Sequence, residues 1–240
     1  MPGCRYQAAL IILSLFACFH IRKKDNYKQG LLHLQQGQLA KAENEFLIAI
    51  ARGDSVERCR GNLIKIYRLR GDSTKIRNQY LALLRDGIVT EDAIKYLADY
   101  YEKSGKFHNY YLILRLGASR IPSFGKMVVN RSLLSKLLTG LMTRRSVKDP
   151  VGWVIRKGIL VPMPDGNFYP DDTVRVENLA VVLSPYLPDP GAVSGSLYPL
   201  GYPLAKIEKL GFSSLIYYPS QPLRLKDAFS ILDRAKNYLR

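Results

Sequence analysis

Three glycines recur at an interval of 34 residues, at Gly37, Gly71 and Gly105. Each of them separates two stretches in which apolar residues recur with helical spacing. A fixed period of this length is typical of stacked helix-turn-helix units, which cannot bury their apolar faces alone and therefore stack on one another. The chain is thus expected to form a helical scaffold that presents a surface to a partner, and to bind rather than to catalyse.

The period predicts three helix pairs. They cover residues 26–36 with 39–51, 56–69 with 73–86, and 91–103 with 106–118. In the first pair, small and aromatic residues stand where the tetratricopeptide family places its packing residues: Gly30, Gly37, Ala42, Phe46 and Ala49. The segment 26–120 resembles that family, which implies an α-solenoid of about three helix pairs.

In the tetratricopeptide family the first helix of each pair lines a groove that binds peptides. The resemblance implies a groove here that is lined by Arg58, Asn62, Lys65, Arg68 and Lys95. A basic groove favours an acidic peptide or a C-terminal carboxylate, because cations form strong charge-assisted hydrogen bonds with carboxylates. The alternative is that these residues form ordinary solvated helix faces.

The chain carries 36 basic and 20 acidic residues, a formal net charge of +16, and the excess is spread over both halves. A diffuse positive field favours anionic partners such as nucleic acid, acidic lipid headgroups or acidic polysaccharide. No recognisable nucleic-acid module accompanies this charge, so nucleic acid is not an expected partner.

The N-terminal segment resembles an export signal. Residues 8–19 are apolar and uncharged, Arg5 precedes them, and the run is too short to span a bilayer comfortably. Residues 15–18 resemble the lipobox of bacterial lipoproteins, which implies that Cys18 becomes the lipidated first residue of the mature protein. The alternative is an uncleaved signal anchor. Residues 1–25 are therefore expected to be a signal with a short linker, and the protein is expected in the cell envelope, periplasmic or at the surface.

A second motif occupies residues 149–187. A helix runs into Gly158, a turn follows at 165–166, Phe168 is expected to enter a core, and Thr173 is expected to cap a second helix. The order of Gly-Ile-Leu, Asp-Gly-x-Phe-x-Pro and the tetrapeptide 174–177 resembles an S-layer homology motif.

Weaker copies of this motif flank it at residues 108–141 and 200–238. In the S-layer homology family three motifs form one pseudo-threefold domain. The resemblance implies such a helical domain, with short irregular loops, over residues 121–240. Its first motif is expected to begin near residue 106, where it overlaps the third helix pair. The expected fold class is therefore mainly α.

The S-layer homology family binds secondary cell-wall polysaccharide, often with negative groups, and the tetrapeptide arginine lies near the ligand. The resemblance implies roles for six residues in polymer or partner binding: Arg175, Glu177, Arg224, Arg131, Trp153 and Tyr169. A guanidinium offers a planar fork to a carboxylate, and the aromatic rings could stack on sugars. The alternatives are an ion pair between Arg175 and Glu177 or a nearby aspartate, and core packing for Trp153.

No catalytic constellation is recognisable. The histidines His20, His33 and His108 have no nucleophile, carboxylate or metal ligand at a useful spacing, and Cys59, the only cysteine outside the N-terminal segment, is expected to be a small buried residue. No cofactor and no metal are expected.

The sequence therefore predicts an exported adaptor that is not an enzyme. It would hold a protein partner through the helix pairs, and an anionic envelope polymer or a second protein through the C-terminal domain. The alternatives are a structural subunit of an envelope or surface assembly and an accessory subunit of an envelope enzyme complex.

Overall fold

The computed structural model describes residues 25–189, 201–212 and 218–239. This part of the chain is mainly helical, as the sequence predicts. The predicted signal and its Cys18 lie outside the described residues. The chain divides by packing into two compact units, Met1–Leu83 and Leu84–Arg240.

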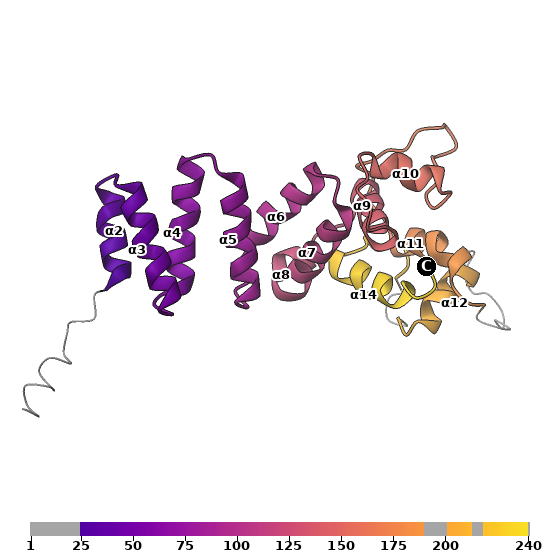
Figure 1. Ribbon diagram of the computed structural model, residues 1–240. Coiled ribbons are helices and arrows are strands. Elements are labelled where there is room, and N and C mark those ends of the chain that lie inside the picture. The colour runs from indigo at the N-terminus through magenta and orange to yellow at the C-terminus, as the bar shows by residue number, and fades with distance from the viewer. Residues whose placement is uncertain (1–24, 190–200, 213–217, 240) are drawn as a thin grey trace, which may run out of the picture. The chain divides into compact units, whose positions relative to one another are not determined.

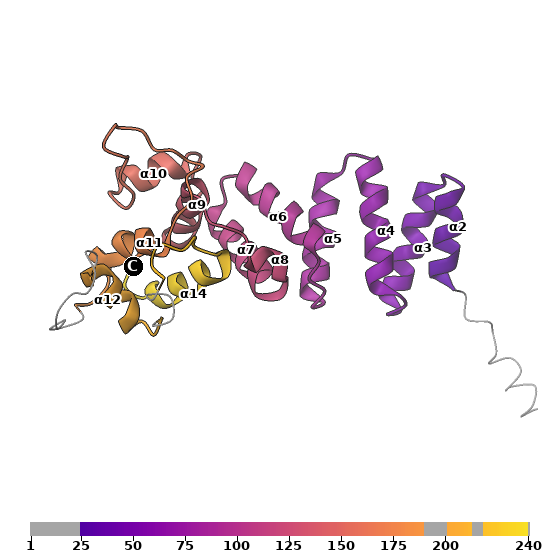
Figure 2. The ribbon, with the colours of Figure 1, turned by 180° about the vertical axis from the view of Figure 1, so that it is seen from behind.

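The first unit is built from antiparallel helices that lie side by side (Figures 1 and 2). These are α2 (Asn26–Gln35), α3 (Leu39–Ala51), α4 (Val56–Leu69) and α5 (Ser73–Arg85). Their bounds agree with the predicted ranges to within one residue at either end. The sequence period therefore identifies the helix pairs and their limits.

The three periodic glycines adopt the same backbone conformation. The φ angles of Gly37, Gly71 and Gly105 are 70°, 69° and 66°. In each case the residue after the glycine donates its backbone N–H to the carbonyl five residues before it, over 2.9 to 3.0 Å. This pattern ends a helix in the left-handed conformation, which glycine adopts without the steric cost of a Cβ. The 34-residue interval is thus an interval of identical helix ends.

The small residues of the first pair allow α2 and α3 to approach closely. A Cβ on Gly30 would lie 2.6 Å from the ring of Phe46, so only glycine leaves room for that ring. Phe46, Ala42 and Ala49 are fully buried. Cys59 is also fully buried, as predicted, and burial raises the pKa of its thiol to about 11, which makes it a poor nucleophile.

The second unit contains the remaining helices. Their bounds are α6 (Glu91–Lys103), α7 (Phe107–Arg120), α8 (Pro122–Gly125), α9 (Arg131–Met142), α10 (Pro150–Arg156), α11 (Val176–Leu183), the 3-10 helix η1 (Ser184–Tyr186), α12 (Gly201–Lys209) and α14 (Leu225–Ala235).

Helix α7 lies at the centre of this unit and contacts α6, α8, α9 and α14. The two sequence patterns that overlap near residue 106 therefore fall on one helix, which packs against α6 on the N-terminal side of the chain and against α9 and α14 on the C-terminal side. The packing accordingly divides the helices after Leu83, whereas the sequence patterns change near residue 120. Gly140 of α9 allows the close approach to α7, because a Cβ there would overlap the carbonyl oxygen of Phe107.

Three short extended segments meet in the second unit and form a closed ring of hydrogen bonds. The N–H of Val129 donates to Leu223, that of Leu223 donates to Val174, and that of Val174 donates to Val129, over 2.8 to 2.9 Å. All three side chains are buried to 2% exposure or less. We call this ring the junction. One helix begins two residues after each member, so α9, α11 and α14 start around a common centre.

The junction fixes the register of the three segments. Equivalent positions are 45 residues apart between the first and second segments and 49 residues apart between the second and third. In this register Asn130, and not Arg131, is equivalent to Arg175 and Arg224. Two expectations are therefore corrected. The position of Arg131 in the first copy is shifted by one residue, and Thr173 does not cap the second helix, because the N-cap residue of α11 is Arg175.

Candidate functional site

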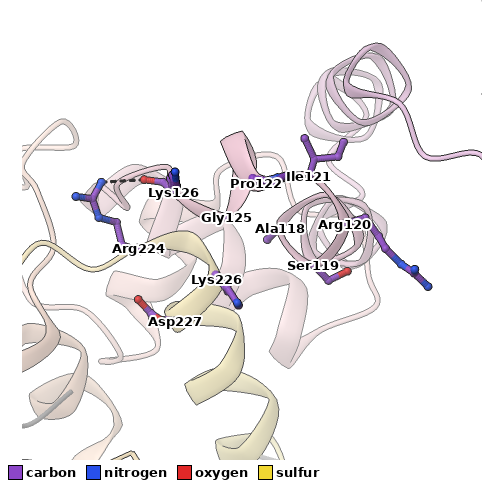
Figure 3. Close-up of a pocket in the computed structure, with 10 residues that line it drawn as sticks. All are labelled: Ala118, Ser119, Arg120, Ile121, Pro122, Gly125, Lys126, Arg224, Lys226 and Asp227. Atoms are coloured by element: carbon purple, nitrogen blue, oxygen red, sulfur yellow. Dashed lines mark hydrogen bonds between the residues drawn. The ribbon is translucent and has the colours of Figure 1, made fainter. Parts of the chain in front are cut away.

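An open cavity of about 550 Å³ lies in the second unit, between the C-terminal end of α7, helix α8 and the start of α14 (Figure 3). Ten residues line it: Ala118, Ser119, Arg120, Ile121, Pro122, Gly125, Lys126, Arg224, Lys226 and Asp227. No aromatic ring is among these described lining residues. The cavity joins residues about 100 positions apart in sequence, because the junction brings the first and third segments together.

The lining carries an excess of positive charge. Among its described residues are four basic ones and a single carboxylate, Asp227. Within the described part of the chain, Arg120, Lys126 and Lys226 make neither an ion pair nor a side-chain hydrogen bond. Lys226 points into the space between α14 and the end of α7, whereas the side chain of Arg120 turns outward at the rim (Figure 3). Uncompensated cations around a concave surface attract anions.

Arg224 is held by a backbone contact. Its Nη1 donates to the carbonyl oxygen of Lys126 over 2.9 Å, which fixes the guanidinium at one end of the cavity (Figure 3). A guanidinium has five N–H donors, so this single bond leaves donors for a ligand. Of the three arginines that the sequence singles out, Arg224 is the one that lines this cavity.

Asp227 is the only carboxylate among the described residues of the lining. Burial raises its pKa above the ordinary value, and the nearby cations Lys226 and Arg224 oppose this effect. The pKa rises on balance, because desolvation destabilises the ionised carboxylate more than the neighbouring cations stabilise it. A carboxylate at this place weakens the binding of an anion when it is ionised.

Arg175 occupies the position equivalent to Arg224 but lies in different surroundings. Its Nη1 is 3.7 Å from Glu177, the ion pair that the sequence left open as an alternative. Glu177 in turn accepts a hydrogen bond from Ser220 over 3.2 Å. The positive charge of Arg175 is therefore partly compensated within the chain.

Arg131 clamps the loop that follows α10. Its Nη2 donates to the carbonyl oxygen of Val161 over 2.9 Å, and its guanidinium carbon lies 4.6 Å from the centroid of the Phe168 ring. Phe168 is half-buried under this contact, rather than in an apolar core as expected. Two nitrogens of the Arg131 guanidinium therefore contact the loop, and the third, Nε, is buried.

The two predicted aromatic residues lie away from the cavity. Trp153 is a half-buried residue of α10, and Tyr169 is exposed and donates its hydroxyl to Asp165. The φ angle of Tyr169 is 47°, an uncommon conformation for a residue with a side chain, which is tied by this hydrogen bond within the turn. Neither ring is available as a stacking surface within the cavity.

The predicted peptide groove divides between the two units. In α4 the side chains of Arg58 and Lys65 are exposed, whereas Asn62 is buried and accepts a hydrogen bond from Lys65 over 3.4 Å. Arg68 donates to the hydroxyl of Tyr80 over 2.7 Å. The fifth predicted groove residue, Lys95, lies in the second unit and forms an ion pair with Glu91 over 2.6 Å.

Sequence reasoning missed three of the four cations in the cavity: Arg120, Lys126 and Lys226. No recognisable motif surrounds Arg120 or Lys126. Lys226 stands at the glutamate position of the tetrapeptide in the third copy, and this charge reversal is the one signal that could have pointed to it.

Metal-binding clusters and membrane-spanning helices are both absent from residues 25–189, 201–212 and 218–239. No group of three or more histidine, cysteine or acidic side chains there could hold a metal ion. No helix in these ranges combines the length and the apolar character that crossing a membrane requires.

Comparison with known proteins gives no match: no family model fits the chain, and no curated protein or solved structure is significantly similar to it.

Proposed function

We propose that this protein is a binding module without chemistry of its own, an adaptor of the cell envelope. The helices of the first unit hold a protein partner, and the second unit binds an anionic envelope polymer. The observation that carries the second part is the cavity between α7, α8 and α14, with three cations that have no partner in the described chain. Several cations around one concave surface raise the local concentration of anions, which favours an anionic ligand.

The first unit supports the adaptor interpretation through its exposed basic face on α4. Arg58 and Lys65 project from this helix, and Gly61 lies between them with nothing within 4 Å of the place a Cβ would take. A flat basic helix face favours an acidic peptide segment. The location in the envelope depends on residues 1–25 and stays a prediction.

The test is co-sedimentation of the full chain with purified anionic cell-wall polysaccharide. Binding that falls at least fivefold in Arg224→Ala and stays within twofold of wild type in Arg131→Ala supports polymer binding through the cavity. Equal losses in both variants would point to unspecific charge attraction. Full binding in both variants would place the polymer elsewhere.

Absence of binding to any envelope polymer would favour the alternative, a structural subunit with both units in protein contacts. Pull-down with the first unit's face altered by Arg58→Glu and Lys65→Glu then measures the protein-binding part independently. Loss of a partner that wild type retains supports the adaptor function, and an unchanged set of partners contradicts it.

A further inference from the structure

The three corners of the junction differ in charge. A corner is the place where the start of one helix meets the neighbouring extended segment. There the second residue of the helix lies opposite the residue just before that segment, because the junction fixes the register. The facing pairs are Lys226 with Lys126, Ser132 with Asp171, and Glu177 with Ser220. Only the first of these corners holds two cations, and the cavity lies there.

The backbone is also open at this corner. The second N–H of α9, from Ser132, donates to the carbonyl of Pro170 over 2.8 Å, and that of α11, from Glu177, donates to Pro219 over 3.0 Å. The equivalent N–H of α14, from Lys226, has no acceptor in the described chain, and neither has the next one, from Asp227. Free N–H groups at a helix start carry partial positive charge and bind anions.

The donors at this corner outnumber the oxygens of one carboxylate. The residues that line the cavity supply two ammonium groups and the remaining donors of Arg224, and the backbone N–H groups of Lys226 and Asp227 have no acceptor in the described chain. A carboxylate offers two oxygens and one charge, whereas a phosphate ester offers more oxygens and up to two charges. The described residues of the lining include no aromatic ring, so they offer no surface on which a sugar could stack.

Resting on the proposed function, we infer that the group bound in this cavity is a phosphate ester carried by the anionic polymer. Lys126 and Lys226 bind it as point charges, Arg224 contacts it from the end of the cavity, and the free N–H groups of α14 donate to its oxygens. The corners at Ser132 and Glu177 bind no phosphate. The basic field of the chain as a whole attracts the polymer, and this corner recognises its charged group.

The test uses inorganic phosphate as the probe and the full chain as the protein. Isothermal titration is made with phosphate and, at equal ionic strength, with acetate and malonate. Phosphate is expected to bind, and the double variant Lys126→Gln/Lys226→Gln is expected to weaken it at least tenfold. The matched control Lys148→Gln/Lys157→Gln removes two exposed charges from the same unit and is expected to change binding less than twofold.

Three results would overturn the inference: no phosphate binding, equal weakening in the control variant, or acetate and malonate that bind as well as phosphate. All substituted lysines are exposed, and circular dichroism checks that each variant is folded. A separate binding experiment, the polymer arm, uses the anionic polymer before and after chemical removal of its phosphate groups.

The polymer arm separates this inference from the proposed function. Loss of binding on removal of phosphate supports both. If the dephosphorylated polymer still binds and Lys126→Gln/Lys226→Gln still abolishes binding, the proposed function stands and the phosphate assignment fails. If phosphate binds at the lysines but no polymer does, the assignment stands and the polymer function fails. Equal affinity for neutral vesicles and for vesicles with phosphatidic acid shows that lipid headgroups are not the source.

Discussion

The backbone N–H of Val174 donates to the carbonyl oxygen of Val129 over 2.8 Å, although 45 residues separate them in the chain. Leu223 closes the ring with the other two, and the side chains of all three are buried. This junction brings the starts of α9, α11 and α14 together and thereby creates the basic cavity. The shape of this cavity therefore depends on three residues that do not line it.

Replacement of Leu223 by alanine is expected to destabilise the second unit by about 2–5 kcal/mol, because it leaves a cavity in a fully buried position. Urea denaturation followed by circular dichroism measures the change. The matched variant Val181→Ala alters a residue that is 47% exposed and is expected to stay within about 0.5 kcal/mol of wild type. Similar losses for both variants would show that the junction is not a core.

Two glycines in helices predict opposite effects of an added methyl group. Gly140→Ala is expected to destabilise the protein strongly, since the Cβ would overlap the carbonyl oxygen of Phe107 and force α7 and α9 apart. Gly61→Ala has open space around it and is expected to stabilise α4 by about 0.5–1 kcal/mol through better helix propensity. Melting temperatures of the two variants check the sign of each effect. A stable Gly140→Ala protein would contradict the close approach of α7 and α9.

Glu43 joins three helices of the first unit. It accepts hydrogen bonds from Tyr67 over 2.9 Å and from Lys75 over 3.2 Å, and it pairs with Arg70. Its side chain is only 16% exposed. Glu43→Gln is expected to cost about 1–3 kcal/mol, because it weakens a hydrogen-bonded charge in a mostly buried place. Hydrogen exchange of α3, α4 and α5 in the full chain measures the loss.

The same residue predicts a dependence of stability on pH. Burial raises the pKa of Glu43, but the hydrogen bonds from Arg70, Tyr67 and Lys75 outweigh it, so the pKa lies below its ordinary value of 4.5. The stabilisation is therefore fully present above pH 4.5 and is lost as the pH falls through the lower, folded-state pKa. Glu43→Gln removes this dependence, whereas the exposed Glu57→Gln retains it. Identical acid profiles for wild type and Glu43→Gln would contradict the assignment.

Asp227 predicts tighter anion binding at lower pH. Its raised pKa means that protonation removes the one negative charge of the cavity as the pH falls through a value above the ordinary 3.8. Sulfate is the suitable probe because its own charge does not change in this range. Its affinity is expected to rise on acidification in wild type. In Asp227→Asn it is expected to be higher at neutral pH and nearly independent of pH. A parallel rise in both proteins would assign the effect to another group.

The N-terminal prediction has its own measurement, since residues 1–24 lie outside the described part of the chain. In a bacterial host, globomycin is expected to cause accumulation of a precursor with altered mobility, and Cys18→Ser is expected to abolish the mature lipidated form. An unaltered mobility under both conditions would leave the uncleaved signal anchor as the remaining interpretation.

The helix pairs could be predicted from the sequence because their signals are local. A glycine at each helix end and apolar residues at helical spacing lie within one unit of the pattern, and the φ angles of Gly37, Gly71 and Gly105 agree to within 4°. Gly30 and Phe46 likewise form a local pair whose sizes are complementary. Such features depend on residues that are close in the chain, so a single 34-residue repeat is enough to predict them.

The cavity could not be predicted in the same way, because it depends on the register between segments far apart. The sequence alignment of the first copy is wrong by one residue, because it matches Arg131 to Arg175 where the structure matches Asn130. With that register, Lys126 and Lys226 are not expected to lie opposite each other. The motif predicts Arg224, whereas Arg120 and Lys126 belong to no motif. Whether a cation is compensated depends on contacts such as those of Arg131 with Val161 and Phe168, which spacing does not reveal.

The most direct measurement is a map of backbone amide shifts by ¹⁵N NMR during titration of the full chain with phosphate. The largest shifts are expected at Lys226 and Asp227, whose N–H groups have no acceptor in the described chain, followed by Lys126. The amides of Ser132 and Glu177, which already donate to carbonyl groups, are expected to change little. Largest shifts at Arg175 to Asn178, or along α4, would contradict the assignment of the ligand to this cavity.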